Sequence, residues 1–80
     1  MHETHLIENI FLYLDQEEKN SSRRIKKICI ALSEFGGISE EHFRQHYKKE
    51  SQGTRWESLE IDIQKVTYGP DLEIRRLDFA

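Results

Sequence analysis

Residues 59–64 alternate strictly between aliphatic and polar side chains, and this pattern constrains the fold more than any other part of the chain. In an extended strand, one side of this segment carries only Leu and Ile, whereas the other carries only Glu, Asp and Gln. Such alternation is typical of a strand with one buried face and one face in water. We therefore expect a sheet that is covered by helices on one face only.

Two helices are predicted around an earlier strand. Residues 4–19 place aliphatic and aromatic side chains at the i, i+3, i+4 spacing of one helical face. Ser39 is a predicted N-cap for a helix that reaches about Ser51, and Gly53 occupies the position of a C-terminal cap glycine. Between the helices, residues 24–33 are predicted to form a strand that is partly apolar on both faces.

The last predicted strand changes parity along its length. Its apolar residues fall on one side up to Ile74 and on the other from Leu77 onward, which predicts a bulge near Arg75 and Arg76. A turn at 68–71 precedes this strand, so we expect strands two and three to form an antiparallel hairpin. Strands one and two are joined through a helix and are expected to pair in parallel.

These elements predict one α+β domain over residues 1–80. Their order is α-β-α-β-β, with two helices packed on one face of a small three-stranded mixed sheet. Eighty residues are too few for a second domain.

Composition excludes several classes of protein. The net charge of −3 argues against a dedicated nucleic-acid binder, and no apolar run is long enough to span a membrane. The only cysteine, Cys29, excludes an internal disulfide and a multi-cysteine zinc site. No signal-peptide pattern is present, so a reduced, cytoplasmic setting is expected. The chain has no phosphate-binding glycine loop and no serine nucleophile motif, and an enzyme is not expected.

The first three residues form a candidate metal site. The Met1 amino group, the His2 imidazole and the backbone amides of His2 and Glu3 offer up to four nitrogen ligands. Nickel(II) and copper(II) favour such planar, nitrogen-rich coordination. The alternative is an exposed histidine at a frayed terminus, and the three residues alone do not decide between the two.

A series of motifs along the chain resembles the HypA/HybF family of hydrogenase maturation proteins. Members of that family begin with Met-His-Glu, as here, and continue with an apolar-faced helix. Their first strand is basic at its start and apolar at its end, as in residues 23–32, and a Gly-Glu-Leu-Ser-Gly-like turn follows, here residues 33–37. Their second helix ends in Gly-Thr, as at 53–54, and their last strand is similar to residues 72–78.

The resemblance implies a nickel metallochaperone that binds Ni(2+) through His2 and Glu3, with the Met1 amino group as a further ligand. It also implies a HypB-type GTPase and the large subunit of a nickel–iron hydrogenase as partners. A metal-independent interaction module with the same fold is the alternative function. Such a module would dock a partner, or form a homodimer, through the helix-free face of the sheet.

The chain departs from this family in two ways that affect metal binding. Family members carry a zinc ribbon with two Cys-x-x-Cys pairs, whereas here a short turn near 67–71 stands in its place, so no structural zinc is expected. Some members also supply an aspartate near the start of the second helix as a nickel ligand, and this chain has Ser39 at about that position.

The remaining candidates are weighed against plainer interpretations. His42 and His46 have the i, i+4 spacing of two zinc ligands on a helix, or are a pair beside the apolar face. Cys29 is expected to be a small strand residue, and Trp56 either anchors the second helix or marks a contact surface. A basic set forms a docking patch for an acidic partner, or a solvated strand edge; its members are Arg23, Arg24, Lys26, Lys27, Arg75 and Arg76.

Overall fold

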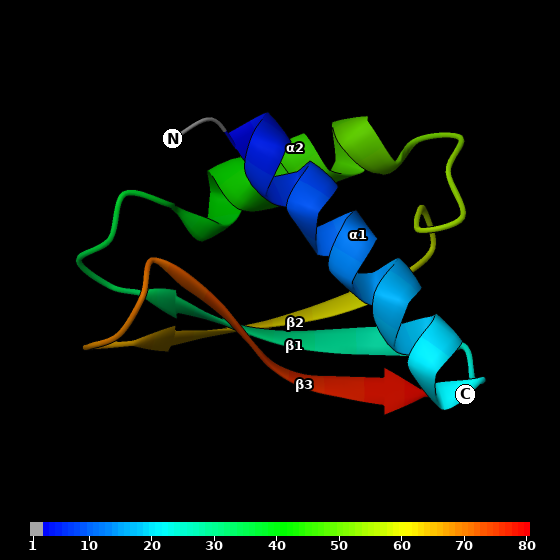
Figure 1. The fold of residues 1–80 in the computed structure, drawn as a ribbon. Helices are drawn as coiled ribbons and strands as arrows, with labels where there is room; N and C mark the ends of the chain where they lie inside the picture. Colours follow the sequence, from blue (N-terminus) through cyan, green and yellow to red (C-terminus); the bar gives the residue numbers. More distant parts are fainter. Residues whose placement is uncertain (1–2) are drawn as a thin grey trace.

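A computed structural model describes residues 3–80, with side chains from residue 5 onward (Figure 1). The elements are α1 (Glu3–Ser21), β1 (Ile25–Ser33), α2 (Glu40–Ser51), β2 (Glu60–Val66) and β3 (Leu72–Phe79). The two helices lie on one face of the three-stranded sheet. This arrangement confirms the predicted α+β class and the α-β-α-β-β order.

An N-cap side chain and residues with positive φ mark the ends of the helices. The Ser39 side chain accepts a hydrogen bond from the backbone N–H of His42 at 3.1 Å, so the predicted N-cap of α2 is confirmed. Gly53 follows α2 with φ +76°, a left-handed conformation that glycine adopts without steric cost. α1 ends at Ser21, and Ser22 then turns the chain with φ 56°.

The strand order is β2-β1-β3, which places the first strand in the centre of the sheet. β1 pairs in parallel with β2, as predicted, and antiparallel with β3. The predicted antiparallel hairpin between β2 and β3 is therefore wrong, because these strands lie on opposite sides of β1. β1 is apolar on both faces, and this is the composition of a central strand rather than of an edge strand.

The turn near 67–71 consequently crosses the end of β1 instead of closing a hairpin. The backbone N–H of Ser33 donates to the Asp71 carbonyl at 3.2 Å, and that of Glu34 donates to the Val66 carbonyl at 2.7 Å. Two inter-strand spacings amount to about 9.6 Å, and five extended residues reach about 16 Å. A short connection is thus long enough to pass over one strand.

β3 contains the predicted bulge. Cys29 is opposite Arg76 and the next residue, Ile30, is opposite Ile74, so Arg75 is the extra residue of the antiparallel ladder. The extra residue shifts the alternation of side chains in β3, so that apolar residues before and after it face the same side of the sheet. As a result, Ile74 and Leu77 both align with β1 residues that face the helices.

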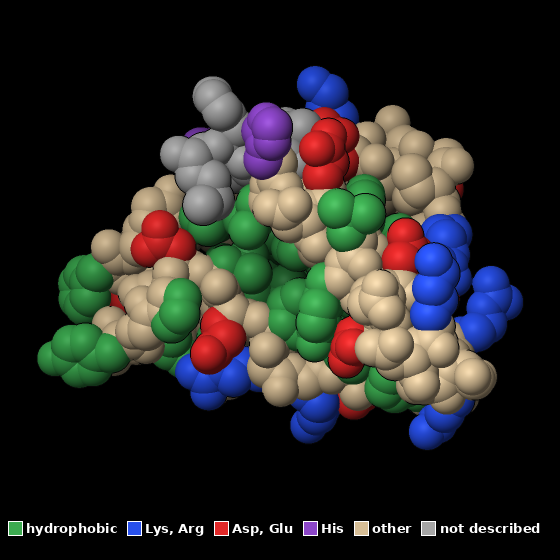
Figure 2. Space-filling model, in the orientation of Figure 1, with side chains coloured by type: hydrophobic (Ala, Val, Ile, Leu, Met, Phe, Trp, Pro, Cys, Tyr) green, Lys and Arg blue, Asp and Glu red, His purple; other side chains and the backbone are tan. Residues whose placement is uncertain are grey.

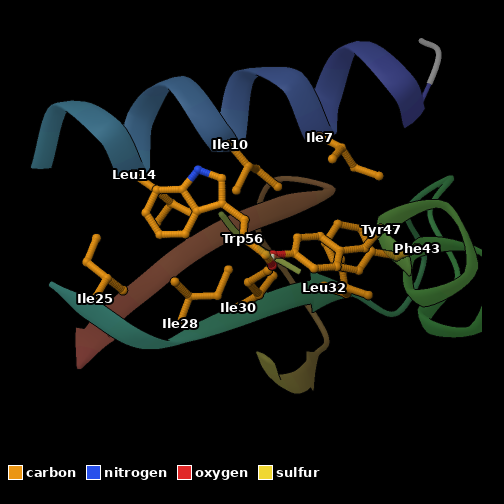
Figure 3. Close-up of a cluster of buried hydrophobic side chains, with 10 residues drawn as sticks. All are labelled: Ile7, Ile10, Leu14, Ile25, Ile28, Ile30, Leu32, Phe43, Tyr47 and Trp56. Atoms are coloured by element: carbon orange, nitrogen blue, oxygen red, sulfur yellow. Dashed lines mark hydrogen bonds between the residues drawn. The ribbon is translucent and has the colours of Figure 1, made fainter. Parts of the chain in front are cut away.

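The core lies between the helices and the sheet (Figure 3). Each of α1, β1 and α2 contributes fully buried side chains, among them Leu14, Ile28 and Phe43. Trp56, in the segment between α2 and β2, is only 4% exposed, and its carbonyl accepts a 2.6 Å hydrogen bond from the Tyr47 hydroxyl. Trp56 therefore anchors the segment after α2 to the core, as one of its two predicted roles required.

The opposite face of the sheet carries charged side chains rather than an apolar surface. The ammonium group of Lys27 on β1 lies 3.7 Å from the carboxylate of Glu60 on β2, and on β3 Arg76 pairs with Asp78 at 3.0 Å. Cys29 lies between the edge strands on this face, opposite Asp62 and Arg76. Within residues 3–80, neither helix is long and apolar enough to cross a membrane.

Replacing Tyr47 with Phe should lower the free energy of unfolding by about 1 kcal/mol at pH 7, because the buried hydrogen bond to Trp56 is lost. Burial also raises the pKa of the Tyr47 phenol above its usual value near 10. The unfolded chain therefore ionises first, and the native protein should lose stability as the pH rises above about 10. Tyr47→Phe should reduce this loss, as measured by urea denaturation at pH 7 and about pH 10.5.

Tyr68→Phe provides the matched control, because the Tyr68 side chain is 86% exposed and its removal should change neither quantity. Equal losses of stability at alkaline pH in the wild type and in Tyr47→Phe would contradict the prediction.

Candidate metal centre

The predicted nickel site adjoins the start of α1. Met1 and His2 lie outside the described residues, and Glu3 is the first residue of the helix. The geometry of these ligands is therefore a prediction from the sequence. The structure describes helix α1, which begins at Glu3.

α1 is packed into the hydrophobic core from its second turn onward. Ile7, one turn after Glu3, is fully buried, and Ile10 is 3% exposed. Farther along, the ring of Phe11 packs edge-on against Tyr47 of α2 with 5.7 Å between the centroids. α1 is thus packed against α2 and the core from Ile7 onward (Figure 1).

The helix start also provides backbone nitrogen atoms suited to a metal. The first N–H groups of an α-helix have no partner within the helix. The amide of Glu3 is one of these groups, because α1 begins there. A metal can therefore replace its proton without breaking a helical hydrogen bond.

The other histidines lie on the two helices. His5 is exposed on α1, His42 is exposed on α2, and His46 is half-buried one turn later. Among the residues that the structure describes, no three His, Cys, Asp or Glu side chains are grouped so that they could hold a metal. The described part of the chain therefore supplies no third ligand for the pair at 42 and 46.

Ser39 has a structural role at the position where some family members place a ligand. Its hydroxyl oxygen caps α2 through the N–H of His42, and Glu40 and Glu41 follow in the first helical turn. Carboxylates at this end of a helix are stabilised by the helix dipole. The described contacts of Ser39 are thus those of a helix cap.

The structure places the six residues of the predicted basic patch on and beside β1 and β3. Lys27 and Arg76 lie on the helix-free face and pair with acidic neighbours, while Arg75 pairs with Glu73. The other three residues lie near the start of β1: Arg23, whose guanidinium lies 5.3 Å from the centre of the Phe79 ring, Arg24 and Lys26. A docking role for these six residues stays a prediction.

Arg55 is the residue that the sequence interpretation missed. Its guanidinium binds the carboxylates of Asp15 and Glu18 on α1 and lies 4.4 Å from the centre of the Trp56 ring. Desolvation acts to lower the pKa of Arg55, but the hydrogen bonds and charges of Glu18 and Asp15 outweigh it and raise this pKa. In the sequence, the i, i+3 spacing of Asp15 and Glu18 indicates that both carboxylates lie on one face of a helix. The sequence does not indicate that Arg55 is their partner.

Comparison with known proteins identifies the family. The family model described as hydrogenase/urease nickel incorporation, metallochaperone, hypA matches residues 1–70. The chain belongs to the HypA family. No curated protein matches the chain.

Membership of the HypA family settles the broad class of the protein. The family description is that of a nickel-incorporation metallochaperone. The matched residues include the start of the chain and everything through the turn at 67–70, and β3 lies beyond them. The resemblance inferred for residues 72–78 therefore rests on the sequence motif alone.

Ser39→Ala should lower the free energy of unfolding by about 0.5–2 kcal/mol, because it removes the cap of α2. Ser39→Asp should stay close to the wild type, because aspartate is an equally good N-cap. Urea denaturation of the three proteins measures the difference. Equal stability of Ser39→Ala and the wild type would show that the capping hydrogen bond contributes nothing.

Proposed function

We propose that this HypA-family protein delivers nickel during maturation of a nickel–iron hydrogenase, with the ion held at the N-terminus. The ligands are the His2 imidazole, the backbone amides of His2 and Glu3, and the Met1 amino group. The observation that carries the proposal is the family match, which begins at residue 1 and so includes all three residues. The position of Glu3 as the first residue of α1, where a backbone N–H has no acceptor within the helix, supports it.

Binding by this set is coupled to protonation. The amino group has a reference pKa of about 7.7–8.0, and each backbone amide gives up its proton only to a metal. Nickel binding should therefore release protons and weaken steeply as the pH falls. The Glu3 carboxylate supplies either an additional ligand or an acceptor for the second nitrogen of the His2 ring.

Delivery requires partners that exchange ligands with the bound ion. The family description places the protein in hydrogenase or urease nickel incorporation. We propose a HypB-type GTPase and a hydrogenase large subunit as the donor or acceptor proteins. Transfer proceeds by stepwise replacement of the terminal ligands, and no rearrangement of the buried core is needed.

The alternative function is a metal-independent interaction module. In this alternative, the helix-free face of the sheet docks a partner protein or a second copy of the chain. In the described structure that face carries ion pairs such as Lys27–Glu60 and Arg76–Asp78, which are more typical of a solvated surface than of an apolar interface. We therefore give preference to the nickel chaperone.

His2→Ala should abolish nickel binding at pH 7.5, because the side-chain ligand is lost. The measurement is a nickel titration of protein with a free Met1 amino group, followed by the weak d–d absorption band of planar nickel(II). His46→Ala is the matched control and should bind like the wild type. Equal binding by His2→Ala and the wild type would falsify the proposed site.

Lowering the pH to about 6 should weaken nickel binding by at least tenfold, since the amino group and the imidazole are then largely protonated. A Gly-Ser extension ahead of Met1 should have a similar effect at pH 7.5, because it converts the amine into an amide. Nickel affinity that is unchanged by the extension would exclude the amino group as a ligand.

A further inference from the structure

A hollow of about 330 Å³ lies between the end of α1, the start of β1 and the segment after α2. Its lining includes Arg24, Lys26 and Arg55, together with the carboxylate of Glu18. Arg55 is bound to Glu18 and Asp15, so among the described residues Arg24 and Lys26 are the side-chain cations of the lining without a bound carboxylate; Ala80 also lines the hollow. Figure 2 shows Lys and Arg side chains gathered on the side of the molecule where α1 ends.

Arg24 and Lys26 are the cations available to an external ligand. Both are exposed, and within residues 3–80 neither has an ion-pair partner within 4 Å. In contrast, Lys27 of the same strand is paired with Glu60. Arg23 donates to the Ala80 carbonyl and lies over the Phe79 ring, and it does not line the hollow.

The backbone around these two cations is well defined. The carbonyl of Arg24 accepts a hydrogen bond from the N–H of Ala80 at 2.7 Å, which ties it to the end of β3. The N–H of the next residue, Ile25, donates to the Glu18 carboxylate at 2.7 Å. Lys26 is the extra residue at a register shift between β1 and β3. Arg24 thus lies directly before β1 and Lys26 lies within it, and backbone hydrogen bonds or strand pairing hold both positions.

Arg55 and Glu18 also line the hollow, and their side chains are paired with each other. Glu18 accepts hydrogen bonds from both the Ile25 amide and the Arg55 guanidinium, and Arg55 also binds Asp15. The Arg55 charge is therefore already compensated. The carboxylate of Glu18 remains in the lining, where it disfavours a ligand with concentrated negative charge.

We propose that this hollow docks an acidic segment of a partner protein, in which successive Asp or Glu side chains pair with Arg24 and Lys26. The planar guanidinium matches a carboxylate with two hydrogen bonds, and single charges spread along a peptide avoid Glu18 better than a phosphate dianion does. Nucleic acid fits poorly, because Trp56 is buried and offers no stacking surface.

The proposed docking surface is independent of the nickel site. α1 contains 19 residues, so its two ends are about 27 Å apart. The hollow lies at the end of α1, and Glu3 lies at its start. A partner can therefore bind here while the first residues remain accessible to a second protein.

Fluorescence anisotropy with a fluorescein-labelled hexaglutamate peptide at about 50 mM NaCl tests the proposal. The wild type should bind, and Arg24→Gln/Lys26→Gln should bind at least about fivefold more weakly. Lys48→Gln/Lys49→Gln makes the same change in net charge on exposed positions of α2 and should stay within about twofold of the wild type. Circular dichroism confirms that each variant is folded.

Three results would overturn the docking proposal. They are no binding of the peptide by the wild type, equal weakening by the two double variants, and displacement of the peptide by inorganic phosphate at equal or lower concentration. The last result would assign the hollow to phosphate. Nickel titration of Arg24→Gln/Lys26→Gln should match the wild type, so the nickel site and the docking surface fail or succeed separately.

Discussion

β1 is the strand to which both other strands are hydrogen-bonded, and the architecture depends on its two apolar faces. Its helix-facing side chains, Ile28, Ile30 and Leu32, meet the core from α1 and α2, while Cys29 and Ala31 fill the opposite face between charged edge strands. In the central position, the small side chains of Cys29 and Ala31 on the helix-free face are flanked on both sides by longer polar side chains of β2 and β3. The order β2-β1-β3, the parallel crossover and the turn across the end of β1 all follow from that placement.

Glu18 connects the ends of three segments. Its carboxylate accepts from the Ile25 amide at the start of β1 and from Arg55 after α2, and Arg55 lies over the Trp56 ring. These contacts set how the end of α1 approaches the sheet, and they leave Arg24 and Lys26 at the rim of a hollow. The same network therefore stabilises the fold and shapes the proposed docking surface.

The two proposed functions use opposite ends of one helix. At its start, α1 carries Glu3, one of the predicted nickel ligands, and Ile7 is buried in the core one turn later. At its end, α1 provides the acidic side chains that hold Arg55. A metallochaperone must contact at least a donor and an acceptor of the ion, and separate surfaces allow both contacts without competition.

The sequence by itself determined the elements, the cap at Ser39, the bulge at Arg75 and the HypA family, because each depends on local periodicity, local hydrogen bonding or motif order. It also gave the candidate ligands His2 and Glu3, which remain a prediction. Only the tertiary structure decided the strand order, the partner of Glu18 and which of the basic residues are ion-paired. Those features depend on contacts between segments that are distant in the chain. A short turn is compatible both with a hairpin and with a connection that crosses another strand. Any of several arginines could have reached the Glu18 carboxylate.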